Sequence, residues 1–292
     1  AIGSFALDLS TTASNNVALG FNSLNACTTG GGNTAVGSNA GKSVTTAVNI
    51  CAVGSTCLDA VTTGVSNTGV GNGALSTVTT HYDNVAVGTS AMGGATANQC
   101  VAMGHSALNL STGANNTAIG NRALTLNTSG TENTAVGAFA LDANTTANYI
   151  TAIGYNCLSN NTTGSNNTGV GRSALLANVT GNNNTAVGFN ALILNTGSSN
   201  TGCGTSALAS NTSGNDNTVL GRNAMNGNTT GSQNTAIGAL ALDANTSSSS
   251  NTAVGYSALG ANTTGQNNTG MGREAMALNT TGQQNVAVGS FA

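Results

Sequence analysis

The 292-residue sequence contains no proline and no tryptophan, and only 4% of its residues are charged. An ordinary globular domain carries about 25% charged residues. The net charge is −3 and the five basic residues form no cluster, so we expect no binding to nucleic acid. No apolar run reaches the roughly 18 residues that a membrane-spanning helix needs. Because 39% of the residues are hydrophobic and recur in register, we expect a folded chain and not a disordered one.

Residues that carry chemistry are also sparse. Four of the aspartates share one position of the repeat described below, yet they lie several repeats apart: Asp8, Asp59, Asp142 and Asp243. No paired carboxylates, metal-ligand cluster, nucleophile elbow or phosphate-binding loop is recognisable. The six cysteines lack CxxC spacing and mostly replace small residues, so we expect buried thiols and no disulfide framework. The sequence therefore predicts no enzymatic activity, no cofactor and no metal site.

What the sequence does contain is one short unit repeated along its whole length. A glycine preceded by a small and then an aliphatic residue recurs eighteen times, at intervals of 17 residues fourteen times and 16 residues three times. These glycines are Gly3, Gly20, Gly37, Gly54, Gly71, Gly88, Gly104, Gly120, Gly137, Gly154, Gly171, Gly188, Gly204, Gly221, Gly238, Gly255, Gly272 and Gly289. We number each coil from its glycine at position 0, which places Val36 at −1, Ala35 at −2 and Thr34 at −3. Positions +3 and +4 are usually Ala and Leu.

A unit of this length cannot bury a core alone, and its two apolar patches are too short for helices and are bounded by Asn, Gly and Ser. We therefore predict an all-β fold, a parallel β-solenoid of about 18 coils with 16–17 residues and two short strands each, forming one continuous domain over residues 1–292. Side chains alternate along a strand. We expect Val at −1 and Leu at +4 inside the coil, and an Ala/Gly face outside that packs against other chains, most simply in a homotrimer.

The most regular polar residue is the asparagine at −4. Asparagine can adopt positive φ and can stack its amide on the same residue of the next coil. Its apolar replacements, Ile50, Cys100 and Ile150, indicate that the position is at least half buried. We therefore predict a structural ladder and not a ligand site, formed by Asn116, Asn133, Asn167, Asn184, Asn217, Asn234 and Asn268.

Three other polar patterns leave alternatives open. Arginine recurs every third coil, at Arg122, Arg172, Arg222 and Arg273. It forms either scattered solvated charge or a surface row that pairs with carboxylates of neighbouring chains or with an anionic glycan. Glycosylation sequons begin at Asn144, Asn178, Asn211, Asn228, Asn262 and Asn279, although the repeat itself generates them. A threonine ladder at Thr145, Thr162, Thr229 and Thr263 suggests an ice-binding face, although these residues lie in a turn.

The motifs Asn-Thr-Ala-Val-Gly and Asn-Thr-Thr-Gly-x-x-Asn-Thr resemble two sets of known repeats. Residues 116–120, Asn-Thr-Ala-Ile-Gly, are similar to the Asn-Ser-Val-Ala-Ile-Gly repeats of trimeric autotransporter adhesin heads, whose coil is shorter. Long repeat tracts of phage tail-fibre proteins are also similar. The resemblance covers the whole chain and implies a trimeric left-handed β-roll displayed outside the cell or on a virion. No functional residues carry over, because the repeats of both families are structural.

We therefore expect a structural and adhesive fibre segment that is extracellular, on a cell surface or on a virion, with a cell-surface glycan or receptor as partner. Residues 1–6 nearly repeat residues 287–292, so we expect the segment to belong to a longer chain. The matching ends also support an alternative, a head-to-tail extracellular filament with or without glycans. The remaining alternative is an ice-binding solenoid.

Overall fold

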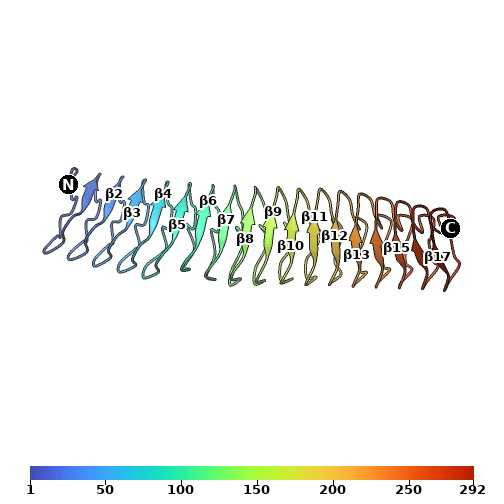
Figure 1. The fold of residues 1–292 in the computed structure, drawn as a ribbon. Helices are drawn as coiled ribbons and strands as arrows, with labels where there is room; N and C mark the ends of the chain where they lie inside the picture. The colour runs from blue at the N-terminus through green and yellow to red at the C-terminus, as the bar shows by residue number, and fades with distance from the viewer. The chain divides into compact units, whose positions relative to one another are not determined.

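The computed structural model describes residues 1–292 and contains strands and turns but no helix. Each coil contributes one strand of three residues at positions −3 to −1, and successive strands follow one another in sequence order (Figure 1). The prediction of an all-β parallel β-solenoid with coils of about 17 residues is confirmed. The predicted second strand does not form. Positions +1 to +6 are consecutive turns instead.

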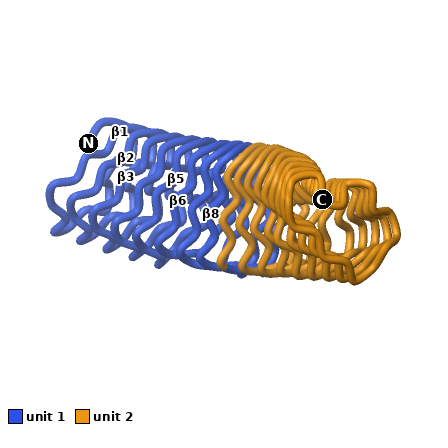
Figure 2. Tube along the Cα trace, turned by 45° about the vertical axis from the view of Figure 1, so that its right-hand side comes forward, with its two compact units in different colours: residues 1–148 blue, residues 149–292 orange.

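The chain consists of two compact units, residues 1–148 and residues 149–292 (Figure 2). Unit 1 contains β1 (Val17–Leu19), β2 (Thr34–Val36), β3 (Cys51–Val53), β4 (Thr68–Val70), β5 (Val85–Val87), β6 (Val101–Met103), β7 (Thr117–Ile119) and β8 (Thr134–Val136). Unit 2 contains β9 (Thr151–Ile153), β10 (Thr168–Val170), β11 (Thr185–Val187), β12 (Thr201–Cys203), β13 (Thr218–Leu220), β14 (Thr235–Ile237), β15 (Thr252–Val254), β16 (Thr269–Met271) and β17 (Val286–Val288).

Within each unit, consecutive strands pair in parallel with equal coil positions opposite each other. In unit 2, Thr168 pairs with Thr185 across β10 and β11. The register is kept across a 16-residue coil, since Thr185 in turn pairs with Thr201. The missing residue is therefore absorbed in the turns. Each coil position becomes a straight column of side chains with a spacing of about 4.8 Å, the distance between neighbouring strands.

The interior of each coil is narrow and is filled by small residues from the strand. Ala186, the middle residue of β11, is fully buried, and so are Ala174 at +3 and Leu175 at +4. A Cβ built on Gly169 at −2 would meet the side chains of Cys157 and Leu158, so position −2 faces positions +3 and +4 of the preceding coil. The prediction that valine lies inside and alanine outside is wrong. Position −2 is glycine or alanine in every coil except that of Val219, which is also fully buried, and the −1 and −3 side chains point outward.

Two positions of the coil depend on an unusual backbone. Gly188 at position 0 has φ of 136°, and a Cβ there would lie 2.6 Å from the carbonyl oxygen of Gly204. This close approach of successive coils explains why every coil keeps glycine at position 0. The predicted positive φ at the −4 asparagine is wrong, because positive φ occurs one residue earlier, as at Asn183 with φ of 58°. The −4 asparagine itself directly precedes the strand.

Candidate functional site

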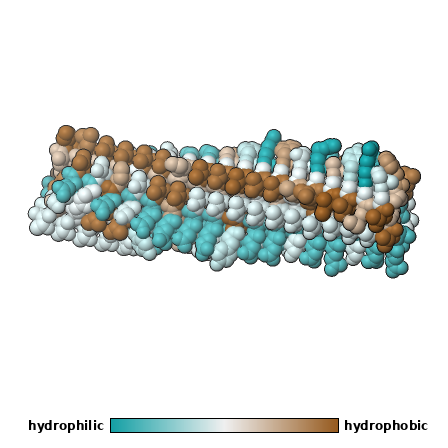
Figure 3. Space-filling model, viewed as in Figure 1, coloured by the Kyte–Doolittle hydropathy of each residue, from teal (hydrophilic) through white to brown (hydrophobic).

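The outward face of the strands carries two columns, one at −3 and one at −1. In unit 2 the −3 column is threonine in eight successive coils: Thr151, Thr168, Thr185, Thr201, Thr218, Thr235, Thr252 and Thr269. The −1 column is apolar in the same coils: Ile153, Val170, Val187, Cys203, Leu220, Ile237, Val254 and Met271. We call these two columns the strand face. It contains no charged residue. Figure 3 shows apolar residues gathered in a continuous row on the side in view.

The apolar column of the strand face is open to solvent. Leu220 is 49% exposed, Met271 43% and Ile237 37%. Scattered single apolar residues are ordinary on a protein surface, whereas a continuous row of them marks a surface for interaction. The row exists because the narrow interior excludes these side chains.

The threonine hydroxyls of the strand face in unit 2 make no hydrogen bond within the protein. The threonines of the turn behave differently. Thr229 at +8 donates its hydroxyl hydrogen to the carbonyl oxygen of Thr246 at 2.8 Å, and Thr212 donates to Thr229 at 2.9 Å. The turn threonines that suggested an ice-binding surface therefore link successive coils, and the free hydroxyl array lies on the strands. Unit 1 lacks such an array, because Val17, Cys51, Val85 and Val101 replace threonine.

The −4 asparagines form a buried ladder. Asn133 donates its backbone N–H to Oδ1 of Asn116 at 3.0 Å, and Nδ2 of Asn116 donates to the carbonyl oxygen of Gly130 at 2.8 Å. The same contacts recur along unit 2, as between Asn217 and Asn234 at 3.0 Å. The seven predicted ladder residues Asn116, Asn133, Asn167, Asn184, Asn217, Asn234 and Asn268 are all at most 1% exposed. Their amides bond inside the fold, so this column offers nothing to a ligand.

A second asparagine ladder at +7 was not singled out from the sequence. Nδ2 of Asn228 donates to Oδ1 of Asn211 at 2.8 Å and to the carbonyl oxygen of Gly231 at 3.0 Å. The signal was present in the fixed phase of the Asn-Thr-Thr-Gly motif. Five of the six sequon asparagines, Asn144, Asn178, Asn211, Asn228 and Asn262, lie in this ladder with no exposed surface. A glycan at any of them is incompatible with the fold.

The arginines divide between the two units. Arg122 is at position +2 in unit 1, where its guanidinium lies 5.7 Å from the ring centre of Phe139. Arg172, Arg222 and Arg273 share position +1 in unit 2 and form one exposed column. The guanidinium of Arg172 lies between the rings of Tyr155 and Phe189, at 5.9 and 5.7 Å. That of Arg273 lies between the rings of Tyr256 and Phe291, at 5.9 and 5.3 Å.

The remaining titratable groups are isolated. Burial raises the pKa of the carboxyl groups of Asp59, Asp142 and Asp243, which lie coils apart. Burial likewise raises the pKa of the Cys57 and Cys157 thiols to about 12. One ion pair is present, with Nε of Arg273 and Oε1 of Glu274 3.2 Å apart. No acid faces a second acid, a base or a nucleophile in a catalytic arrangement.

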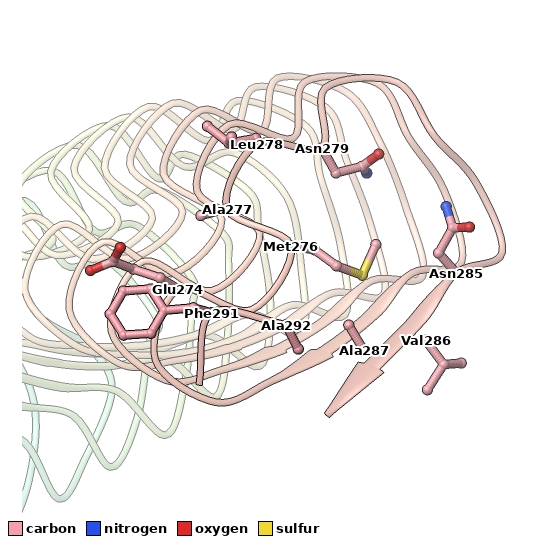
Figure 4. Close-up of a pocket in the computed structure, with 10 residues that line it drawn as sticks. All are labelled: Glu274, Met276, Ala277, Leu278, Asn279, Asn285, Val286, Ala287, Phe291 and Ala292. Atoms are coloured by element: carbon pink, nitrogen blue, oxygen red, sulfur yellow. The ribbon is translucent and has the colours of Figure 1, made fainter. Parts of the chain in front are cut away.

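One pocket lies at the open end of the last coil (Figure 4). Met276, Ala287 and Asn279 line it, together with Val286 and Phe291. Met276, Asn279 and Ala287 occupy interior positions that the next coil covers in the middle of the unit. The pocket is lined by apolar side chains, amide side chains and one carboxylate side chain, that of Glu274. This carboxylate is paired with Arg273, and no other titratable side chain lines the pocket.

No helix of the length and apolarity needed to cross a membrane occurs. No group of three or more histidine, cysteine, aspartate or glutamate side chains is placed to hold a metal ion. No family model, curated protein or solved structure matches the chain.

Proposed function

We propose that this chain is a non-enzymatic structural segment of an extracellular or virion-borne fibre, whose copies associate side by side through the strand face into a homotrimer. The observation that carries the proposal is the uncharged strand face with its exposed apolar column. Burying such a surface stabilises an assembly by about 25 cal/mol for each Å² of apolar area removed from water. A face without charges leaves no unpaired charge when two copies meet.

The repeat itself favours a second copy of this chain as the occupant. Every coil rises by the same distance of about 4.8 Å, so the strand face is a series of ridges with one fixed period. Only a surface with the same period stays in register over many coils. A parallel copy of the chain has that period, whereas an unrelated globular partner matches the ridges over one or two coils at most. Cyclic association of identical faces also closes the assembly and removes the apolar column from water.

The test is the oligomeric state of the purified chain, measured by analytical ultracentrifugation and native mass spectrometry. We expect a discrete trimer for the wild type. The double variant Val187→Lys/Ile237→Lys places two charges on the strand face and should be monomeric. The matched control Thr163→Lys/Gln266→Lys adds the same charge at exposed turn positions and should stay trimeric. A monomeric wild type would refute the proposal, and indefinite filaments unaffected by Val187→Lys/Ile237→Lys would support head-to-tail assembly instead.

A second candidate function, ice binding, is favoured by the eight successive threonines of unit 2. Their hydroxyls have no partner in the protein, and they alternate with apolar side chains on a flat, regular sheet. Such an array can order water at its own period. Thermal hysteresis of the wild type that is lost in Thr201→Tyr/Thr235→Tyr would support this function. If neither the wild type nor the monomeric Val187→Lys/Ile237→Lys variant shows thermal hysteresis at micromolar concentration, the ice-binding function is refuted.

A further inference from the structure

Two arginines in the column of unit 2 are not surrounded only by water, because aromatic rings lie against their guanidinium groups. The side chain of Arg172 comes from the coil between those of Tyr155 and Phe189, so aromatic rings lie on both sides of its guanidinium. Arg273 repeats the arrangement with Tyr256 and Phe291. The coils of Arg172 and Arg273 are six apart, and the coil of Arg222 lies midway between them. The arginines therefore recur every third coil, and two of the three, Arg172 and Arg273, are flanked by rings, whereas Arg222 lies between Thr205 and Ala239.

Flanking rings change what the guanidinium can bind. A cation within about 6 Å of a ring centre is attracted to the ring face, which holds the arginine side chain in place. The rings flank the group, while its N–H donors lie around its edge. A fixed guanidinium with a free edge suits the two oxygens of a carboxylate, because the fork of donors matches them. Arg172 has no carboxylate partner within the protein.

The aromatic rings are also about half exposed to solvent. Tyr155 is 48% exposed, Phe189 44% and Tyr256 47%. The apolar face of a sugar ring can rest on such a half-exposed aromatic ring while a carboxylate on the same sugar reaches the neighbouring arginine. A uronic acid residue carries both groups. A neutral sugar would use only the ring, and a simple anion only the guanidinium.

We propose that the +1 column of unit 2, formed by Arg172 and Arg273 with their neighbouring rings and by Arg222 between them, binds an acidic polysaccharide through the carboxylates of its uronic acid residues. Three coils separate successive arginines, which is about 14 Å at the strand spacing. A single extended chain that runs along the column engages several arginines at once. Each contact alone is weak, because the column is exposed and salt screens charges beyond about 8 Å. Avidity along the polymer supplies the affinity.

The experiment measures binding of the full-length chain to three polymers of matched length by isothermal titration calorimetry. The probes are polygalacturonate, which carries carboxylates, dextran sulfate, which carries sulfates, and the neutral glucan maltoheptaose. We expect binding to polygalacturonate that weakens as salt rises and no binding to maltoheptaose. The variant Arg172→Ala/Arg222→Ala/Arg273→Ala should lose about tenfold or more in affinity. No binding of polygalacturonate, or equal binding of dextran sulfate, would overturn the proposal.

Two further variants separate the geometry of the column from its charge. Arg172→Lys/Arg222→Lys/Arg273→Lys keeps the charge but loses the planar fork, so its affinity should fall nearly as far as that of the alanine variant. Wild-type affinity in the lysine variant would refute the role of the flanked guanidinium. Glu274→Gln removes the carboxylate that pairs with Arg273 and should tighten binding. Thr163→Ala, at an exposed turn position outside the column, is the control that should bind as the wild type does. Circular dichroism and the sedimentation coefficient of each variant check that fold and assembly are unchanged, so a failure here leaves the proposed assembly unaffected.

Discussion

Cys157 and Gly169 form a compensating pair in the core of unit 2, and a double-mutant cycle tests it. Position +3 is usually alanine and position −2 is usually alanine, as in the consecutive coils with Ala174 and Ala186. Where cysteine stands at +3, glycine stands at −2 of the next strand. A Cβ added to Gly169 would lie 2.5 Å from Sγ of Cys157. The same pairing with the same distance joins Cys57 and Gly69 in unit 1.

The magnitudes follow from the space available. Gly169→Ala forces its Cβ into the buried sulfur and should lower the free energy of unfolding by about 1–3 kcal/mol. Cys157→Ala leaves a void beside Gly169 and should cost about 1 kcal/mol. The double variant Cys157→Ala/Gly169→Ala recreates the alanine pair of other coils and should return close to wild-type stability. The coupling energy between the two sites should therefore be about 2–3 kcal/mol.

Hydrogen exchange followed by mass spectrometry is the suitable assay, because a solenoid opens locally and coil by coil. The protection of the amides in β9 and β10, the strands nearest Cys157 and Gly169, reports the free energy of local opening there. Gly202→Ala is the control. Its Cβ would meet Cδ1 of Leu192 at 3.1 Å and no cysteine, so Cys157→Ala should not rescue it. If the double variant loses as much protection as the two single variants combined, the two residues do not compensate and the reasoning is refuted.

Three further predictions concern buried polar groups. Asn217→Ala removes the acceptor of the Asn234 N–H and the donor to the Gly231 carbonyl. It should lower local stability, measured by hydrogen exchange, by about 2–4 kcal/mol. Unchanged protection of these amides would contradict the ladder. Because burial raises the pKa of Asp243, its ionised form is disfavoured in the folded state. Asp243→Asn should therefore raise the melting temperature at neutral pH, by a margin that shrinks as the pH falls through the raised pKa; a margin independent of pH would contradict this origin. With its pKa raised to about 12, the Cys157 thiol should react with iodoacetamide at neutral pH only after unfolding, and rapid labelling of the native protein, seen by mass spectrometry, would show that the thiol is accessible.

Much of the architecture could be predicted from the repeat. A glycine every 16 or 17 residues, with turn residues between short apolar patches, leaves only a stack of coils as a way to bury those patches. Apolar replacements at −4, such as Ile50, correctly indicated that the asparagines there are buried. The second ladder at +7 was missed, because Asn-Thr-Thr-Gly reads equally well as an exposed turn. The column of Arg172, Arg222 and Arg273 was visible as a rhythm, but the rings that flank Arg172 and Arg273 come from neighbouring coils and appear only when the coils are stacked.

The period, the parallel stacking and the burial of the −4 asparagines could therefore be derived from the repeat pattern alone. A residue that recurs at the same position of every coil must stack on the same residue of the next coil, so the repeat period alone gives these features. Tertiary structure alone decided which side of the strand faces inward. Alternation divides Thr-Ala-Val into two faces without saying which is the core, and hydrophobicity favours the valine. The narrow closed coil reverses that choice, since the space opposite positions +3 and +4 holds alanine or glycine in every coil except that of Val219. That reversal leaves the apolar column outside, where it can serve assembly.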